Sequence, residues 1–132
     1  MPRVEAAREL LAPREDVWAF LAEPYHLADW WPGITGVEPD RRAFAPGARW
    51  KVLATKRNIF AGPRPTETML LIREIDPYER WSWHVLRPQT DVEIRLRSVS
   101  EARTAVTVTT SRGSASRAVK RLYDLVQTAA TL

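Results

Sequence analysis

The sequence predicts an α+β domain in which a few helices cover an antiparallel sheet. Strand-like segments with alternating apolar and polar residues follow one another from 48 to 111, whereas helical patterns occupy only 14–31 and the end of the chain. The breaks between successive strand patterns are only a few residues long, which is typical of a meander. With 132 residues and 45% hydrophobic content, the chain is expected to form a single domain (1–132) with one core.

Residues 4–12 are expected to form the first strand. Val4, Ala6 and Leu10 share one face of a period-2 pattern, and Arg8 shares that face with them. A buried arginine needs a partner. We therefore consider three roles for Arg8: an ion pair with Glu67 or Glu74, a contact with a ligand, or a side chain that extends to the surface.

Two short helices are expected next. Arg14–Ala22 begins with two acidic residues, which the helix dipole favours, and carries an apolar stripe. Pro24 breaks this helix and opens a second one, which contains Trp30 and Trp31 and stops at Pro32. We interpret Trp30 as the residue that packs this helix on the sheet. Trp31 is the next residue on the helix, so we expect its side chain to point in a different direction from that of Trp30.

The remaining strands and the last helix follow from alternation and from helical spacing. Two segments, 40–47 and 56–65, contain turn-forming residues and are expected to be loops. The last helix opens at Ser114, a favourable N-cap, and its apolar stripe is expected to cover the buried face of the sheet. The expected strands are 34–39, 48–55, 66–75, 80–87, 90–99 and 104–111.

Several classes of function are disfavoured by composition. The chain has no cysteine, and neither His26 nor His84 has metal-ligand spacing, so we expect no metal. It also lacks a glycine-rich phosphate loop and a nucleophile elbow, so we expect no cofactor. The net charge is +4, but the basic residues are scattered, which argues against a specific nucleic-acid partner.

The sequence also bears on location. No apolar run approaches the about 20 residues needed to span a bilayer. Residues 1–12 alternate and carry charges, so they lack the apolar core of a signal peptide. We therefore expect a cytoplasmic protein without a membrane span, either a monomer or a homodimer.

The order of elements and several residues resemble the START-like, or SRPBCC, superfamily, and within it the bacterial polyketide cyclase/dehydrase and lipid-transport family. The resemblance implies a helix-grip fold, with a seven-stranded antiparallel sheet around a long C-terminal helix and a cavity between them for an apolar or aromatic molecule. It rests on Ala12-Pro13, Glu15-Asp16-Val17-Trp18, Glu23-Pro24, Leu27, Trp30 and Pro32, and more weakly on Asp76-Pro77 and Thr104-Ala105-Val106.

Candidate cavity residues come from the apolar strand faces and the last helix. Trp81, Trp83 and Val85 share one face, and Trp83 either lines a ligand site or packs the core. A slip of one residue would place His84 there instead. The full expected set is Trp50, Val52, Met69, Leu71, Trp81, Trp83, Val85, Ile94, Val108, Leu122 and Val126.

Three functions fit this sequence. The first is the binding of a hydrophobic or aromatic small molecule, such as a lipid, an isoprenoid or a polyketide. The second is a polyketide aromatase/cyclase or dehydratase, in which Arg8, His84 or Tyr123 would converge in the cavity to handle protons. The third is an interaction protein similar to the ribosome-associated toxins, in which the basic surface would matter more than the cavity.

Overall fold

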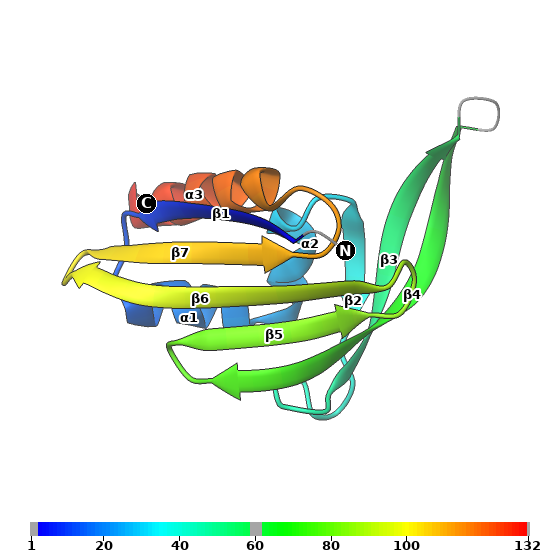
Figure 1. Ribbon diagram of the computed structural model, residues 1–132, viewed down its shortest axis with the longest axis horizontal. Coiled ribbons are helices and arrows are strands. Elements are labelled where there is room, and N and C mark those ends of the chain that lie inside the picture. Colours follow the sequence, from blue (N-terminus) through cyan, green and yellow to red (C-terminus); the bar gives the residue numbers. More distant parts are fainter. Residues whose placement is uncertain (1–2, 59–61, 132) are drawn as a thin grey trace.

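Seven antiparallel strands form one sheet in the computed structural model, which describes residues 3–58 and 62–131. The sheet order is β1-β7-β6-β5-β4-β3-β2, so strands consecutive in sequence are neighbours from β2 to β7 (Figure 1). The predicted α+β helix-grip fold is confirmed. The strands are β1 (Val4–Leu10), β2 (Ile34–Glu38), β3 (Arg49–Asn58), β4 (Gly62–Asp76), β5 (Arg80–Val85), β6 (Thr90–Ser100) and β7 (Arg103–Thr110).

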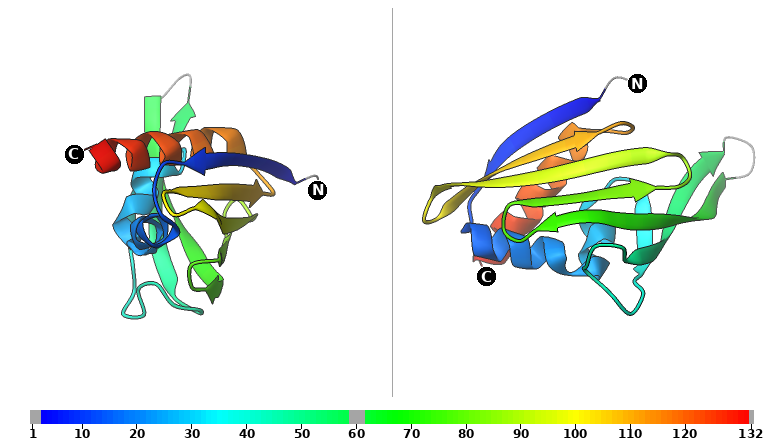
Figure 2. Two further views of the ribbon diagram at one scale, coloured as in Figure 1. Left: turned by 90° about the vertical axis from the view of Figure 1, so that its left-hand side faces the viewer. Right: turned by 60° about the horizontal axis from the view of Figure 1, so that its bottom comes forward.

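The helices lie on the concave side of this bent sheet (Figure 2). The long C-terminal helix α3 (Ala115–Thr131) packs on β1, β7 and α2. Ser114 caps it as expected, because its hydroxyl accepts the backbone N–H of Arg117 at 3.1 Å. The short helices are α1 (Arg14–Ala22), the 3-10 turn η1 (Pro24–His26) and α2 (Leu27–Trp30). In the part of the chain that is described, no helix is long and apolar enough to cross a membrane.

One expected loop is wrong. Residues 56–65 were assigned to a loop on their glycine and prolines, but β3 continues to Asn58 and β4 already begins at Gly62. The prolines are tolerated because β5 pairs with β4 only from Leu70 onward. The first half of β4 therefore pairs on one side alone, with β3, and a proline can sit where its missing N–H is not needed. This hairpin projects beyond the rest of the sheet (Figure 1).

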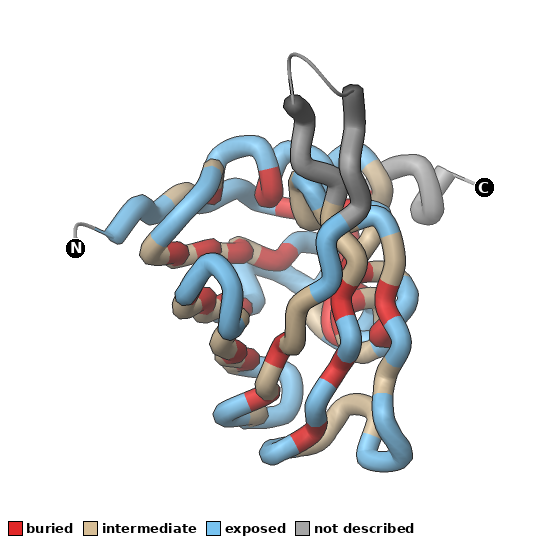
Figure 3. Tube along the Cα trace, turned by 90° about the vertical axis from the view of Figure 1, so that its right-hand side faces the viewer, coloured by how far each residue is buried: buried red, intermediate tan, exposed pale blue. Residues whose placement is uncertain are grey.

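The register defines two faces of the sheet. The inner face, towards α3, carries alternate residues that pair directly across strands, such as Trp81 with Ile94 and Ile94 with Val108. On β4 a bulge between Ile72 and Glu74 keeps Ile75 on the inner face opposite Trp81. Buried residues alternate along the strands with exposed ones, as Figure 3 shows. The core therefore sits between the inner face and the helices.

Candidate ligand site in the tryptophan cluster

Five tryptophans meet between the inner face and α2, and we call them the tryptophan cluster. Trp81 and Trp83 of β5 are adjacent, with ring centroids 4.4 Å apart. Trp50 of β3 lies 5.7 Å from Trp81, while Trp31 and Trp30 lie 5.4 and 6.3 Å from Trp83. Most of these pairs are edge-to-face or tilted, which are the favourable arrangements of aromatic quadrupoles. The cluster is a continuous aromatic wall.

Local structure explains how these rings come together. Alternation along β5 points Trp81 and Trp83 to the same face. Pro24 stands at the start of η1, and the carboxylate of Glu23 accepts the N–H of Tyr25 at 3.5 Å, so the chain turns towards the sheet. The backbone becomes extended after Trp30, which separates the directions of the two consecutive indoles.

The two consecutive indoles of the cluster differ in exposure. Trp30 is fully buried, whereas Trp31 is only half-buried and forms the outer edge of the cluster. Its ring stands edge-to-face on both Trp30 and Trp83. Trp31 is therefore the point at which the cluster meets the surface.

The indole N–H groups of the cluster are not equivalent. The N–H of Trp50 donates to the carbonyl oxygen of Ala43 at 2.6 Å. The Nε1 atoms of Trp30, Trp81 and Trp83 are removed from solvent, and none of them has an acceptor in the part of the chain that the structure describes. A buried donor without a partner costs about 1–3 kcal/mol, so these three groups are an unusual feature of a folded core.

The surroundings of these donors are apolar and uncharged. Among the residues whose burial is described, the only buried polar side chains are three threonines, and no ionisable side chain is buried. The threonine hydroxyls donate to backbone carbonyls: Thr90 to Pro88, Thr104 to Ala12 and Thr110 to Arg112. Among the residues of described burial, the core therefore contains free indole donors and no ionisable residue, and its buried side-chain acceptors are the oxygens of these three threonines.

Most of the expected cavity residues lie on the inner face or on α3. All of these are buried except Val85, which is half-buried. They belong to one contiguous core together with the tryptophan cluster. Their contact with a ligand stays a prediction. The residues are Trp50, Val52, Trp81, Trp83, Val85, Ile94, Val108, Leu122 and Val126.

Two expected cavity residues, Met69 and Leu71, are on the wrong face. Met69 pairs with Lys51 and Leu71 with Arg49, which places both on the outer face. Leu70 and Ile72 take the inner positions and are fully buried. The cause is a run of four apolar residues, 69–72, in which alternation cannot define the inward face.

The polar candidates do not reach the tryptophan cluster. Arg8 follows the inner register of β1 but is exposed, and its Cζ lies 5.0 Å from the ring centroid of Tyr123 on α3. This is a cation–π contact at the sheet edge, and two strands, β7 and β6, separate it from β5. Of the three roles considered for Arg8, the ion pair is not formed, because Glu67 pairs with Lys51 and Glu74 with Arg80, and the exposed side chain agrees with the role that extends to the surface.

His84 lies on the outer face, opposite Trp81 and Trp83, as alternation requires. Its Nδ1 is 2.8 Å from Oδ1 of Asp91, and 16% of its side chain is exposed. Arg8 and Tyr123 therefore meet on one side of the sheet and His84 stands on the other. The three expected proton-handling groups do not converge.

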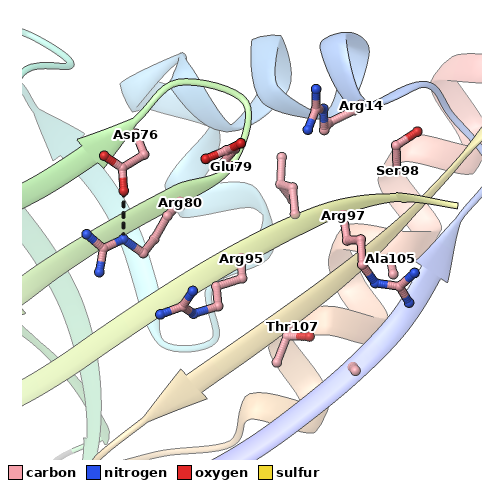
Figure 4. Close-up of a pocket in the computed structure, with 11 residues that line it drawn as sticks. Arg14, Asp76, Glu79, Arg80, Arg95, Arg97, Ser98, Ala105 and Thr107 are labelled. Atoms are coloured by element: carbon pink, nitrogen blue, oxygen red, sulfur yellow. Dashed lines mark hydrogen bonds and ion pairs between the residues drawn. The ribbon is translucent and has the colours of Figure 1, made fainter.

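A groove of about 830 Å³ lies outside the core, along β1, β5, β6 and β7 and the start of α1 (Figure 4). Four arginines line it, but they are not gathered on one point. Arg80 is held by Asp76 at 3.0 Å and also pairs with Glu74 and Glu93. Arg14 and Arg97 extend in different directions in Figure 4. Among the described residues, no group of three or more histidines or carboxylates is placed to hold a metal.

The sheet bent around α3, with an aromatic core between them, defines a START-like protein of the SRPBCC superfamily. Residues 1–130 match the family described as "Polyketide cyclase / dehydrase and lipid transport". The chain belongs to this family. A search among curated proteins finds no match to the sequence.

Solved structures with the same fold have diverse functions. A START superfamily protein from Mycobacterium smegmatis is 9% identical, with a TM-score of 0.72 and coverage of 96% of this chain and 98% of its own. Norcoclaurine synthase from Thalictrum flavum, solved as a point mutant with a transition-state analogue, is 13% identical with a TM-score of 0.71 and coverages of 98% and 96%. The di-domain ARO/CYC BexL of the BE-7585A biosynthetic pathway is 20% identical with a TM-score of 0.63, over 99% of this chain and 42% of BexL. At these identities the likeness establishes the fold alone.

Proposed function

We propose that this protein binds a hydrophobic or aromatic small molecule between the inner face of the sheet and the helices, at the tryptophan cluster beside α2. The observation that carries the proposal is a continuous wall of five indoles with one member, Trp31, at the surface. Aromatic walls with few polar groups are typical of small-molecule sites. The family includes proteins of lipid transport and of polyketide chemistry, and both classes of substrate have large apolar surfaces.

Trp31 is the proposed point of access. Its ring covers the edge of Trp83 at a centroid distance of 5.4 Å, and it is the half-buried member of the cluster. A change of its rotamer would expose one side of Trp83 without moving a strand. The aromatic ring of the ligand would then pack on Trp83 in the place that the Trp31 ring had occupied.

Binding fits the geometry better than catalysis does. The enzymatic alternative needs a group that moves protons at the ligand, and Arg8, Tyr123 and His84 are not gathered at the cluster. The groups that do border the cluster are indole N–H donors, which position an acceptor but do not exchange a proton near neutral pH. The binding of a ligand for transport or sensing therefore explains more features of the site than an enzymatic reaction does.

The proposal is tested by titrating the protein with flat aromatic hydrocarbons and ketones while following intrinsic fluorescence and the melting temperature. A ligand at 100 times its Kd is expected to stabilise the fold by about 2.7 kcal/mol. Trp83→Leu should abolish the response, whereas Trp18→Leu, which alters a buried tryptophan outside the cluster, should retain it. If no compound of the panel binds, the proposal is wrong.

A further inference from the structure

The unpartnered donors of the tryptophan cluster restrict what its ligand can be. Trp30 and Trp81 are 0% exposed and Trp83 is 1% exposed, yet none of their indole N–H groups has an acceptor among the described residues. The three indoles belong to one network of ring contacts, in which Trp83 touches both of the others. Of the four buried side-chain nitrogens without a partner among the described residues, three belong to this network, and the fourth is Nε of Arg14 on α1.

Trp50 serves as an internal comparison. It belongs to the same cluster and is equally buried, but its N–H donates to the carbonyl of Ala43 at 2.6 Å. The fold can therefore satisfy an indole N–H in this region. A core that needed only packing could use phenylalanine at positions 30, 81 and 83, because phenylalanine brings the same class of surface without a donor.

The same core excludes other ligand chemistry. Its buried hydroxyls are already used by backbone carbonyls, and no ionisable side chain among the residues of described burial is buried. A ligand that brought its own O–H or N–H group would find, among the side chains of described burial, only the oxygens of Thr90, Thr104 and Thr110 as buried acceptors, and they lie on β6 and β7 rather than on the elements that carry the unpartnered indoles. A ligand carboxylate would be desolvated without a counter-ion, which is costly.

We infer that the ligand is a neutral, flat molecule that carries a hydrogen-bond acceptor without an adjacent donor, such as a ketone or quinone oxygen or an aromatic ring nitrogen. Its acceptor receives the N–H of Trp83 and of a neighbouring indole, and its rings pack on the remaining faces. This inference rests on the proposed function and goes further, because it separates neutral ketones from hydrocarbons and from fatty acids.

The test compares 9-fluorenone with fluorene, two flat molecules that differ by one carbonyl oxygen. A single net hydrogen bond is worth about 2-fold to about 13-fold in affinity. Fluorenone should therefore bind at least about 2-fold more tightly than fluorene. Trp83→Phe should reduce the preference towards unity. Trp50→Phe is the matched control, since its indole N–H is already taken by Ala43, and it should leave the preference unchanged.

A second readout needs no variant protein. In ¹⁵N-labelled protein, fluorenone should move indole N–H resonances downfield, and these should be those of the three unpartnered tryptophans rather than that of Trp50. Oleate should compete with neither compound.

The outcomes separate the two proposals. Equal affinity for fluorene and fluorenone, with unmoved indole resonances, overturns the inference and leaves the proposed function standing. Tight binding of oleate would also overturn the inference. If neither aromatic compound nor oleate binds, the proposed function fails and the inference falls with it.

Discussion

The exchange of tryptophan for phenylalanine at two positions of the tryptophan cluster measures how much an unpartnered indole N–H costs in free energy of unfolding. Trp83→Phe and Trp50→Phe remove the same atoms from side chains that are equally buried. Loss of apolar area and creation of a small void are therefore similar in the two variants. What differs is the indole N–H, which is unpartnered in Trp83 and bonded to Ala43 in Trp50.

The difference between the two free energies of unfolding follows from these contacts. Trp50→Phe forfeits a hydrogen bond worth about 0.5–1.5 kcal/mol and leaves the Ala43 carbonyl without this donor. Trp83→Phe removes an unsatisfied donor that costs about 1–3 kcal/mol. We therefore expect Trp50→Phe to be the more destabilised variant, by about 1.5–4.5 kcal/mol.

Urea unfolding followed by far-ultraviolet circular dichroism measures this difference on ligand-free protein. Circular dichroism is preferred to fluorescence, because both variants change the fluorophores. Equal destabilisation of the two variants, or a larger loss for Trp83→Phe, would show that the Trp83 N–H already has a partner. The reasoning about the donors would then be refuted.

Three further predictions concern the register, a surface carboxylate and access to the cluster. Ile72→Ala should cost about 2–5 kcal/mol in urea unfolding and Leu71→Ala clearly less, because only Ile72 is buried on the inner face; similar losses would contradict the register. The backbone N–H of Arg49 holds the pKa of Asp40 below its usual value, so the stability from this contact is present above about pH 4 and is lost as the pH falls through the lowered pKa. Urea unfolding from pH 7 to pH 3 should thus show a shallower decline in Asp40→Asn, and an unchanged decline would exclude the contribution. Trp31→Ala should accelerate both association and dissociation of fluorenone in stopped-flow measurements, and unchanged rates would place the access elsewhere.

The sequence correctly predicted the elements whose residue pattern is compatible with only one local structure. Trp81 and Trp83 alternate with Ser82 and His84, so only one face of β5 could be buried. The two short helices are marked by a proline at the start of each and a further proline after the second. In each case, local chemistry and tertiary packing favour the same structure.

The wrong predictions concern segments in which strand pairing, and not the local residue pattern, decides the structure. The apolar run 69–72 has no polar residue to mark its outer side, so only pairing with β3 decides that Leu70 and Ile72 face inward. The prolines of 62–65 favour a loop, but they are compatible with a strand that pairs on one side. Both facts depend on neighbouring strands, which the local sequence does not contain.

The unpartnered donors were not predictable either. Composition gives six tryptophans but not the acceptors near them. The contrast between Trp50 and Trp83 depends on the path of the chain at Ala43, which brings one carbonyl within reach of one indole. A hydrogen-bond partner is a tertiary property, and an alternating strand pattern determines only the face on which a side chain lies.

Native mass spectrometry of protein purified from its natural host tests the central claim most directly. The account predicts a non-covalent adduct whose released ligand is neutral, aromatic and furnished with a carbonyl or ring-nitrogen acceptor, and which is absent from the Trp83→Leu variant. A protein that carries a fatty acid, or a ligand retained equally by Trp83→Leu, would contradict the account.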